Sequence, residues 1–271
     1  MSSVSISTNK LTIGYTSSRQ HSAVSTQTVV QSDLTFSLYE GEMVYMLGPN
    51  GCGKSTLLRT LAGLQPPLSG EYSLYSVSPK DGLYSVSEQS ERSKSVALVL
   101  TEKLSMDNTT VHDVVAMGRY PYTSFLGGLT PEDETIIGES LQQVGFDPSP
   151  VTGNPSPLQT TFFNAHSDGE KQRILIAKAL AQQTPVILLD EPTAHLDLPH
   201  RILILRLLRR LAHEQGKTVL ISTHELDLAL ALSDRILLMS KSSYYLDTAD
   251  NLRKTDAFTT AFGMDIFNPL N

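Results

Sequence analysis

The sequence predicts an α/β protein whose central sheet is mainly parallel. Beyond Gly169, the apolar runs "PVILLDE", "TVLIST" and "RILLM" alternate with the helical patterns "GEKQRILIAKALAQQ", "PHRILILRLLRRLAHEQ" and "ELDLALALSD". Upstream, the apolar run "GEMVYML" leads through a glycine-rich turn into the helical run "KSTLLRTLAGL". Strands that alternate with helices usually lie parallel in one sheet and place ligands at their carboxyl ends. We therefore expect functional residues where these strands end.

Two other regions have a different pattern. At the N-terminus, "VSIST" and "KLTIGY" predict antiparallel strands, and the Ser/Thr/Gln-rich stretch 16–33 predicts a loop or a long hairpin connection. From about 110 to 145, "TVHDVVAMGRY" and "TPEDETIIGESLQQVG" predict helices. Thr130 is expected to cap the second helix, because Pro131 suits the first helical position and acidic residues follow it. The proline-rich "GFDPSPVTGNPSPLQTT" predicts a linker, and the tail predicts one short helix and a strand.

The composition is that of a soluble globular protein, with 40% hydrophobic and 18% charged residues among 271. A net charge of −7 disfavours a general nucleic-acid-binding surface. Cys52 is the single cysteine, so no internal disulfide can form, as expected in a reducing compartment. The N-terminus lacks the apolar core of a secretory signal, and no run reaches the roughly 18 apolar residues of a membrane span. We expect a cytoplasmic protein.

The segment "GPNGCGKS" fits the phosphate-loop pattern G-x-x-x-x-G-K-[ST] between a predicted strand and helix. Its glycines let backbone amides point inward, and the helix N-terminus favours phosphate. Lys54 is expected to reach the β- and γ-phosphates, and Ser55 to offer its hydroxyl to Mg²⁺. The alternative for this segment is a glycine turn that only caps a helix. For Cys52 the alternatives are a small filler residue and a redox switch. The candidate nucleotide-binding residues are Gly48, Pro49, Asn50, Gly51, Cys52, Gly53, Lys54, Ser55 and Thr56.

Two carboxylates, Asp190 and Glu191, end the apolar run in "VILLDEPT". Asp190 would support Mg²⁺ directly or through water. Glu191 would orient and polarise the attacking water as general base, an effect of about 10²–10⁴-fold. His224 ends "TVLISTH" and could bond the γ-phosphate or hold that water. The alternative is that these groups are solvated ends of strands. Together with Lys54 they are the candidate catalytic residues of a P-loop NTPase core.

These motifs, in this order and spacing, resemble the ATP-binding subunits of ABC transporters over nearly the whole chain, from Leu11 to about Gly263. The phosphate loop resembles Walker A, and the run ending at Glu191 resembles Walker B. "AHLD", which ends at Asp197, resembles the D-loop, and His224 resembles the switch histidine. Tyr15 in "LTIGY" is similar to the aromatic that stacks on adenine, the alternative being an ordinary strand aromatic.

"HSDGE" resembles the family's signature, which is usually Leu-Ser-Gly-Gly-Gln. The resemblance implies that Ser167 and Gly169 contact the γ-phosphate held by a second, head-to-tail copy of the chain. Two ATP molecules would then join two subunits, and hydrolysis would release them. His166 and Asp168 depart from the usual pattern, and the Asp168 carboxylate would weaken closure on ATP unless it turns outward.

A second departure is Thr101, which stands where the family has the Q-loop glutamine that helps to bind Mg²⁺ and links the site to the membrane partner. Thr101 could act through water, or Glu102 could take part. "VVAMGRYPYTSFLGGLTPEDE" resembles the helical region of importers for iron-siderophore complexes, haem and cobalamin, the alternative being a helical subdomain shared with zinc or manganese importers. The resemblance implies a single domain: a core of about 1–100 and 184–271 with an antiparallel β subdomain, and an α-helical subdomain of about 101–183.

The expected function is that of a transport ATPase using ATP and Mg²⁺. It would work as a homodimer below a polytopic permease, at the cytoplasmic face of the inner or plasma membrane. A periplasmic or lipoprotein substrate-binding protein would act with it indirectly, and no nucleic acid would bind. One alternative is a soluble ABC ATPase acting on nucleic acid or ribosomes, although the chain has neither a long coiled coil nor a second ATPase unit. Another is a scaffold that does not hydrolyse ATP, which the presence of Lys54 and Glu191 disfavours.

Overall fold

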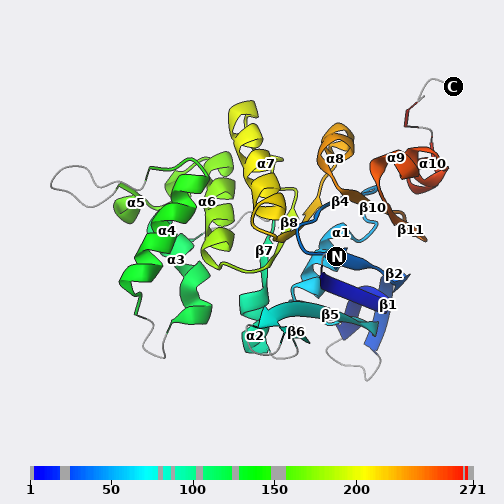
Figure 1. Cartoon of the computed structure of the whole chain (residues 1–271), viewed down its shortest axis with the longest axis horizontal. Helices are drawn as coiled ribbons and strands as arrows, with labels where there is room; N and C mark the ends of the chain where they lie inside the picture. The colour runs from blue at the N-terminus through cyan, green and yellow to red at the C-terminus, as the bar shows by residue number, and fades with distance from the viewer. Residues whose placement is uncertain are drawn as a thin grey trace.

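The computed structural model describes residues 3–18, 25–78, 82–86, 89–101, 106–123, 128–147, 157–264 and 266–267. Most of the helices before residue 181 gather at one end of the molecule, and a small antiparallel sheet lies at the other end (Figure 1). A larger sheet lies between them. Within these ranges no helix combines the length and apolar character that crossing a membrane requires.

The larger sheet is parallel except at one edge, as the alternation of strands and helices predicts. Its strands, in spatial order, are β11 (Tyr244–Asp247), β10 (Arg235–Met239), β4 (Met43–Leu47), β9 (Thr218–Ser222), β8 (Val186–Asp190) and β7 (Val96–Val99). Only β11 runs antiparallel to its neighbour. The central strands β4, β9 and β8 are buried along their whole length, so both faces of the sheet are covered.

Alternate residues of the central strands enter two different cores. On β4, Tyr45 packs on the side of the helices α7 (Leu198–His213) and α8 (Leu226–Leu232), whereas Met46 packs on the side of α1 (Lys54–Leu61). The core on the α1 side also holds the inner residues of the antiparallel sheet. Two-sided cover leaves the ends of the strands as the accessible part of the sheet.

The antiparallel sheet consists of β1 (Val4–Ser18), β2 (Ser25–Leu34), β3 (Ser37–Tyr39), β5 (Ser69–Ser78) and β6 (Gly82–Ser85). The two predicted N-terminal segments form one strand, whose pairing with β5 is irregular between Asn9 and Thr12, where Lys10 has a φ of +47°. The stretch 16–33, predicted as a loop or a long hairpin connection, instead forms parts of two paired strands: residues 16–18 end β1, and β2 begins at Ser25 and pairs with the second half of β1. Polar side chains suit this strand because much of it faces solvent.

Helix α2 (Gln89–Ser95) contacts β5 and β7. The helical region contains α3 (Val111–Ala116), the 3₁₀ helix η1 (Met117–Tyr122), α4 (Pro131–Gln143), α5 (Pro157–Thr160), η2 (Phe163–Ala165) and α6 (Asp168–Ala181). Helix α4 begins as predicted, with Thr130 as its cap and Pro131 in its first turn. The predicted linker contains the short helix α5, and its residues 148–156 lie outside the described ranges.

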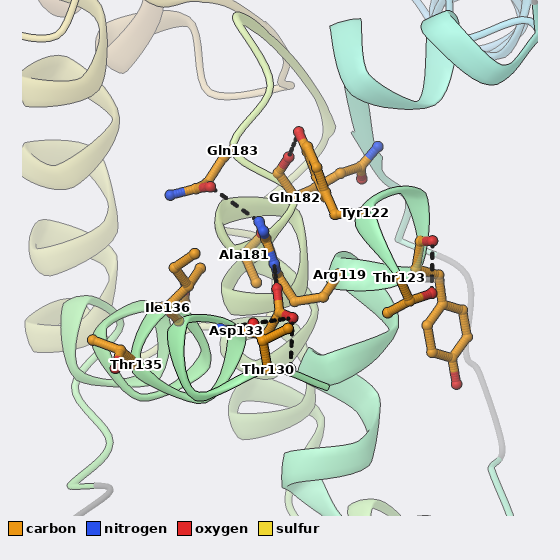
Figure 2. Close-up of polar contacts among 12 residues, drawn as sticks. Arg119, Tyr122, Thr123, Thr130, Asp133, Thr135, Ile136, Ala181, Gln182 and Gln183 are labelled. Atoms are coloured by element: carbon orange, nitrogen blue, oxygen red, sulfur yellow. Dashed lines mark hydrogen bonds and ion pairs between the residues drawn. The ribbon is translucent and has the colours of Figure 1, made fainter. Parts of the chain in front are cut away.

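A buried ion pair ties three parts of this region together (Figure 2). Arg119 of η1 donates from Nε to Asp133 Oδ1 at 2.7 Å and from Nη1 to the carbonyl oxygen of Ala181 at 2.8 Å. A further bond, 3.0 Å long, joins Nη1 to Gln183 Oε1, and the guanidinium carbon lies 4.2 Å from the ring centre of Tyr122. Arg119 therefore links η1, the start of α4 and the end of α6.

The C-terminal region contains α9 (Ala249–Arg253) and α10 (Ala257–Phe262). The strand predicted in the tail falls largely outside the described residues, and the described residues after α10, 263–264 and 266–267, form no strand. Phe267 instead packs edge-on against Phe258 of α10, with the ring centres 5.2 Å apart. Apolar residues of the tail thus cover the core without pairing with a sheet edge.

Candidate functional site

The phosphate loop joins β4 to α1 through three glycines with positive φ: Gly48 at +153°, Gly51 at +76° and Gly53 at +105°. A Cβ on Gly48 would lie 2.2 Å from the carbonyl oxygen of Met239, so no other residue fits there. Lys54 is buried, and its Nζ donates to the carbonyl oxygens of Gly48 at 2.8 Å and Pro49 at 3.3 Å. The lysine thus lies across the loop at the position from which it can reach a phosphate.

Gln31, which the sequence analysis did not single out, fastens this loop to the rest of the molecule. Its Nε2 donates to the carbonyl oxygen of Cys52 at 3.1 Å and to that of Ser240. Burial raises the pKa of the Cys52 thiol, more than Lys54 lowers it. A neutral, buried thiol is the form expected of a small filler residue. No sequence signal marked Gln31, because it lies in the stretch predicted as a loop.

Tyr15 lies beside the first turn of α1. Its hydroxyl is 2.8 Å from Thr56 Oγ1, and about half of its surface, 48%, is exposed. It borders an open pocket of about 490 Å³ that is also lined by Arg59 and Gln65. The geometry brings Tyr15 to the phosphate loop despite the long hairpin between them, and leaves its ring partly open to a ligand.

The two carboxylates lie at the carboxyl edge of the parallel sheet. Asp190 is buried, and one of its carboxylate oxygens accepts the hydroxyl proton of Ser222. The Ser222 hydroxyl also accepts the backbone N–H of Glu191 at 3.1 Å. Thr101 Oγ1 donates to the backbone oxygen of Asp190 at 2.6 Å. Ser222 therefore orients both acidic residues, a role that no sequence motif marks.

Glu191 and His224 face each other across neighbouring strand ends. The distance from Glu191 Oε1 to His224 Nε2 is 2.6 Å, and each side chain is partly exposed. Glu191 also has a φ of +45°, which is uncommon for a side chain with a Cβ and is typical of functional sites. A carboxylate and an imidazole at this distance can share and relay a proton, which suits the activation of a water molecule.

Glu225, the residue after His224, is a third residue that sequence reasoning missed, after Gln31 and Ser222. Its carboxylate accepts from Arg201 Nη1 of α7 at 2.8 Å and from Thr193 Oγ1 at 3.2 Å. Its backbone N–H donates to Thr223 Oγ1 at 3.0 Å. These contacts tie the segments that follow β8 and β9 to helix α7. Because Glu191 and His224 lie in these two segments, the contacts fix the position of one relative to the other.

The oxygen donors near the phosphate loop are of the type that Mg²⁺ prefers. Ser55 is exposed at the start of α1, and the Asp190 carboxylate lies at the sheet edge. The described part of the chain has no group of three or more His, Cys, Asp or Glu side chains that could hold a metal by itself. This donor set therefore fits an ion that takes only a few ligands from protein and the rest from phosphate and water. Glu102 lies outside the described residues.

Ser167 is the N-cap of α6 and forms a capping box with Glu170. The Ser167 N–H and O–H both donate to Glu170 Oε2, at 2.9 and 2.8 Å, and the Glu170 N–H donates to Ser167 Oγ at 3.3 Å. A Cβ on Gly169 would lie 2.8 Å from the carbonyl oxygen of His195, so the glycine allows close contact with the D-loop segment. His166 packs edge-on against Phe146.

An open pocket of about 620 Å³ lies between the signature segment, 167–170, and the D-loop segment, 195–197. Asp197 caps α7 at its rim, where it accepts from the His200 backbone N–H at 3.1 Å and lies 2.5 Å from His200 Nδ1. The hydrogen bond from the His200 backbone amide lowers the pKa of Asp197, and the bond from the His200 ring lowers it further. Asp168 is exposed and borders the same pocket.

The predicted site residues thus form two groups. One consists of the phosphate loop, Tyr15 and the strand-end residues; the other consists of the signature and D-loop segments around the open pocket. The residues of the second group line their pocket mainly with polar and charged side chains. None of them was predicted to be catalytic.

Comparison with known proteins gives a consistent family. The family model described as "ABC transporter" matches residues 31–194. The iron(3+)-hydroxamate import ATP-binding protein FhuC of Bacillus subtilis is 33% identical over 267 residues, which cover 96% of this chain and 88% of FhuC. The achromobactin transport ATP-binding protein CbrD of Dickeya dadantii is 34% identical over 263 residues, with the same two coverages of 96% and 88%.

A similar fold occurs in a solved structure described as an inward-facing conformation of a metal-chelate type ABC transporter. It superposes with a TM-score of 0.73 at 28% identity and covers 96% of this chain and 90% of that chain. The similarity extends over the helical region as well as the two sheets, since nearly the whole chain is covered.

Proposed function

Because the chain belongs to the ABC transporter family and is an ATPase of that family, we propose that it powers import of an iron complex, siderophore or haem, or of cobalamin, through a separate permease. The observation that carries the ATP-hydrolysing part of this proposal is the Glu191–His224 pair, 2.6 Å apart at the carboxyl edge of the parallel sheet. The name of FhuC, an iron(3+)-hydroxamate import protein, supports the iron-complex part of this proposal, and haem and cobalamin follow from the resemblance of the helical segment.

ATP binding begins at the phosphate loop. Lys54 exchanges its bonds to the Gly48 and Pro49 carbonyl oxygens for bonds to phosphate oxygens, and the amides at the start of α1 add further donors. The ring of Tyr15 offers a surface on which the adenine can stack. The loop remains in place during this exchange because Gln31 holds the Cys52 carbonyl oxygen.

Hydrolysis needs a water molecule in line with the γ-phosphate. Glu191 accepts a proton from that water, and His224 holds the carboxylate in the required direction. Ser222 keeps the Asp190 carboxylate and the Glu191 backbone in register. Ser55 and Asp190, with Thr101 through the Asp190 backbone, would hold Mg²⁺, which neutralises phosphate charge when bound.

A second copy completes each site. Ser167 and Gly169 of one copy, with Asp197 at the rim of the same pocket, would contact the γ-phosphate on the phosphate loop of the other copy. The positive end of α6 favours this contact. The permease would hold the dimer at the cytoplasmic face of the membrane, and a substrate-binding protein would deliver cargo on the other side. In this proposal the helical region of about 101–183 meets the permease.

The test is to purify the tagged chain from gently solubilised native membranes and to measure both its ATPase activity and its companions. We expect a co-purifying polytopic protein, and a loss of turnover of at least 100-fold in Glu191→Gln. Recovery with nucleic acid or ribosomes alone would favour a soluble ABC ATPase and overturn the transport proposal. Turnover unchanged in Glu191→Gln would remove the general-base assignment.

A further inference from the structure

The signature serine of this chain has its only hydroxyl proton bound within its own helix cap. Ser167 Oγ donates to Glu170 Oε2 at 2.8 Å, and the Ser167 N–H donates to the same oxygen at 2.9 Å. The family pattern has glutamine at this position, and this chain has a carboxylate. A carboxylate only accepts hydrogen bonds, whereas an amide both accepts and donates.

A phosphate oxygen is also an acceptor, so it competes with Glu170 for that one proton. In the observed geometry the Ser167 hydroxyl donates to the Glu170 carboxylate and accepts from the Glu170 N–H, which leaves one lone pair and no proton for a phosphate. The negative phosphate and the Glu170 carboxylate would repel each other. In addition, the bond from Ser167 to Glu170 is charge-assisted, and such bonds are stronger than neutral ones. Closure on ATP therefore requires the Ser167–Glu170 bond to open.

The surrounding charges do not release this bond. The Ser167 backbone amide, with the Ser167 hydroxyl, lowers the pKa of Glu170, so the carboxylate stays ionised at neutral pH. His166 Nδ1 lies 3.6 Å from Glu170 Oε2, which is beyond a good hydrogen bond. Arg173, one turn further along α6, donates to the carbonyl oxygens of Val144 at 3.0 Å and Gly145 at 3.3 Å.

We propose that Glu170 is a positioning residue that retains the Ser167 hydroxyl within its own chain and so raises the ATP concentration at which two copies close. This inference rests on the proposed function, because it needs the signature of one copy to meet the ATP of another. Glutamine at this position would keep the cap, since its amide oxygen still accepts from Ser167, and would remove the charge.

The experiment measures ATPase rate and ATP-induced dimerisation of the full chain as a function of ATP concentration. For Glu170→Gln we expect the half-maximal ATP concentration to fall about tenfold in both assays, with kcat changed less than about twofold. Asp113→Asn is the matched control, because Thr110 and Asp113 form the same capping box at α3, away from the signature segment. It should leave both curves unchanged.

A double-mutant cycle shows whether Glu170 acts through Ser167. In a Ser167→Ala background, Glu170→Gln should lose most of its effect, because no hydroxyl proton remains to be released. An equal fall of the half-maximal ATP concentration in that background would mean that charge alone matters, and would overturn the inference. An unchanged or higher half-maximal ATP concentration in Glu170→Gln alone would also overturn it. If the wild-type chain showed no ATPase activity, or an activity that Lys54→Ala did not reduce, the proposed function would be overturned, and this inference with it.

Discussion

Helices α4 and α6 begin with the same hydrogen-bonding motif in different surroundings. In both, an N-cap hydroxyl residue and an acidic residue three positions on exchange bonds: Thr130 with Asp133, and Ser167 with Glu170. The α4 cap is closed over by Arg119, and both charged side chains there are only 6% exposed. The α6 cap borders an open pocket. The same capping box is therefore enclosed within the fold at α4, whereas at α6 it borders open space.

The largest expected effect is on the covered cap. Arg119→Ala would leave the Asp133 carboxylate buried without its cation, and should lower the free energy of unfolding by about 3–5 kcal/mol. Lys171→Ala, at a partly buried position of α6 where the ammonium lies 5.9 Å from the ring centre of Phe163, should lower it by less than about 1 kcal/mol. Urea unfolding of both variants measures the difference. Equal losses would show that burial does not distinguish the two caps.

Acid should act on the covered cap next. Bonds from Thr130 and Arg119 lower the pKa of Asp133 from its ordinary 3.8 to about 2. A lowered pKa stabilises the fold above about pH 4, and this stabilisation, about 2 kcal/mol, is lost as pH falls through 2. The difference in unfolding free energy between wild type and Asp133→Asn should therefore shrink between pH 5 and pH 2. A difference that stays constant over this range would contradict the assignment.

Removing the cap hydroxyls should cost similar stability and have unequal effects on activity. Thr130→Ala and Ser167→Ala should each lower the free energy of unfolding by about 1 kcal/mol. Only Ser167→Ala should raise the ATP concentration needed for ATPase activity, because only that hydroxyl lies in the pocket that would receive a second subunit. Paired thermal melts and ATP titrations test this. Similar ATP titrations for the two variants would abolish the functional distinction between the caps.

The smallest effect on stability should come from Glu170→Gln. The side chain is partly exposed and its replacement can still accept the cap bonds, so unfolding free energy should change by no more than about 0.5 kcal/mol. Asp133→Asn should cost clearly more, since it breaks a buried ion pair. Chemical denaturation of the two variants side by side is the measurement, and a larger loss in Glu170→Gln would reverse the comparison.

The parallel sheet was predictable because its signal is local. The strands β4, β8 and β9 are short apolar runs bounded by turn residues, and each is followed by a helix of regular period. The α4 cap was predictable for the same reason, since cap chemistry involves residues three positions apart. The strand β2 was not predictable, because its polar side chains carry no alternation and its stability comes from pairing with β1.

The candidate site divides in the same way. The phosphate loop and the strand-end carboxylates follow from their residue order, although their roles remain predictions. Gln31, Ser222 and Glu225 carry no motif, and their contacts join segments 21 to 209 positions apart in sequence. Pairings at such separations depend on the fold as a whole, which composition and periodicity do not encode.

The ion pair between Arg201 and Glu225 has a consequence for the order of events in a catalytic cycle. Asp197 caps α7 in the pocket proposed to receive the second subunit, and Arg201 lies one helical turn further along, beside the residue that follows His224. One turn is about 5.4 Å, so a small shift of α7 at the subunit contact would displace Arg201 and Glu225 by a similar amount. His224, the neighbour of Glu225, would thereby move relative to Glu191. Hydrolysis would then be interlocked with subunit pairing, and a lone subunit would waste little ATP.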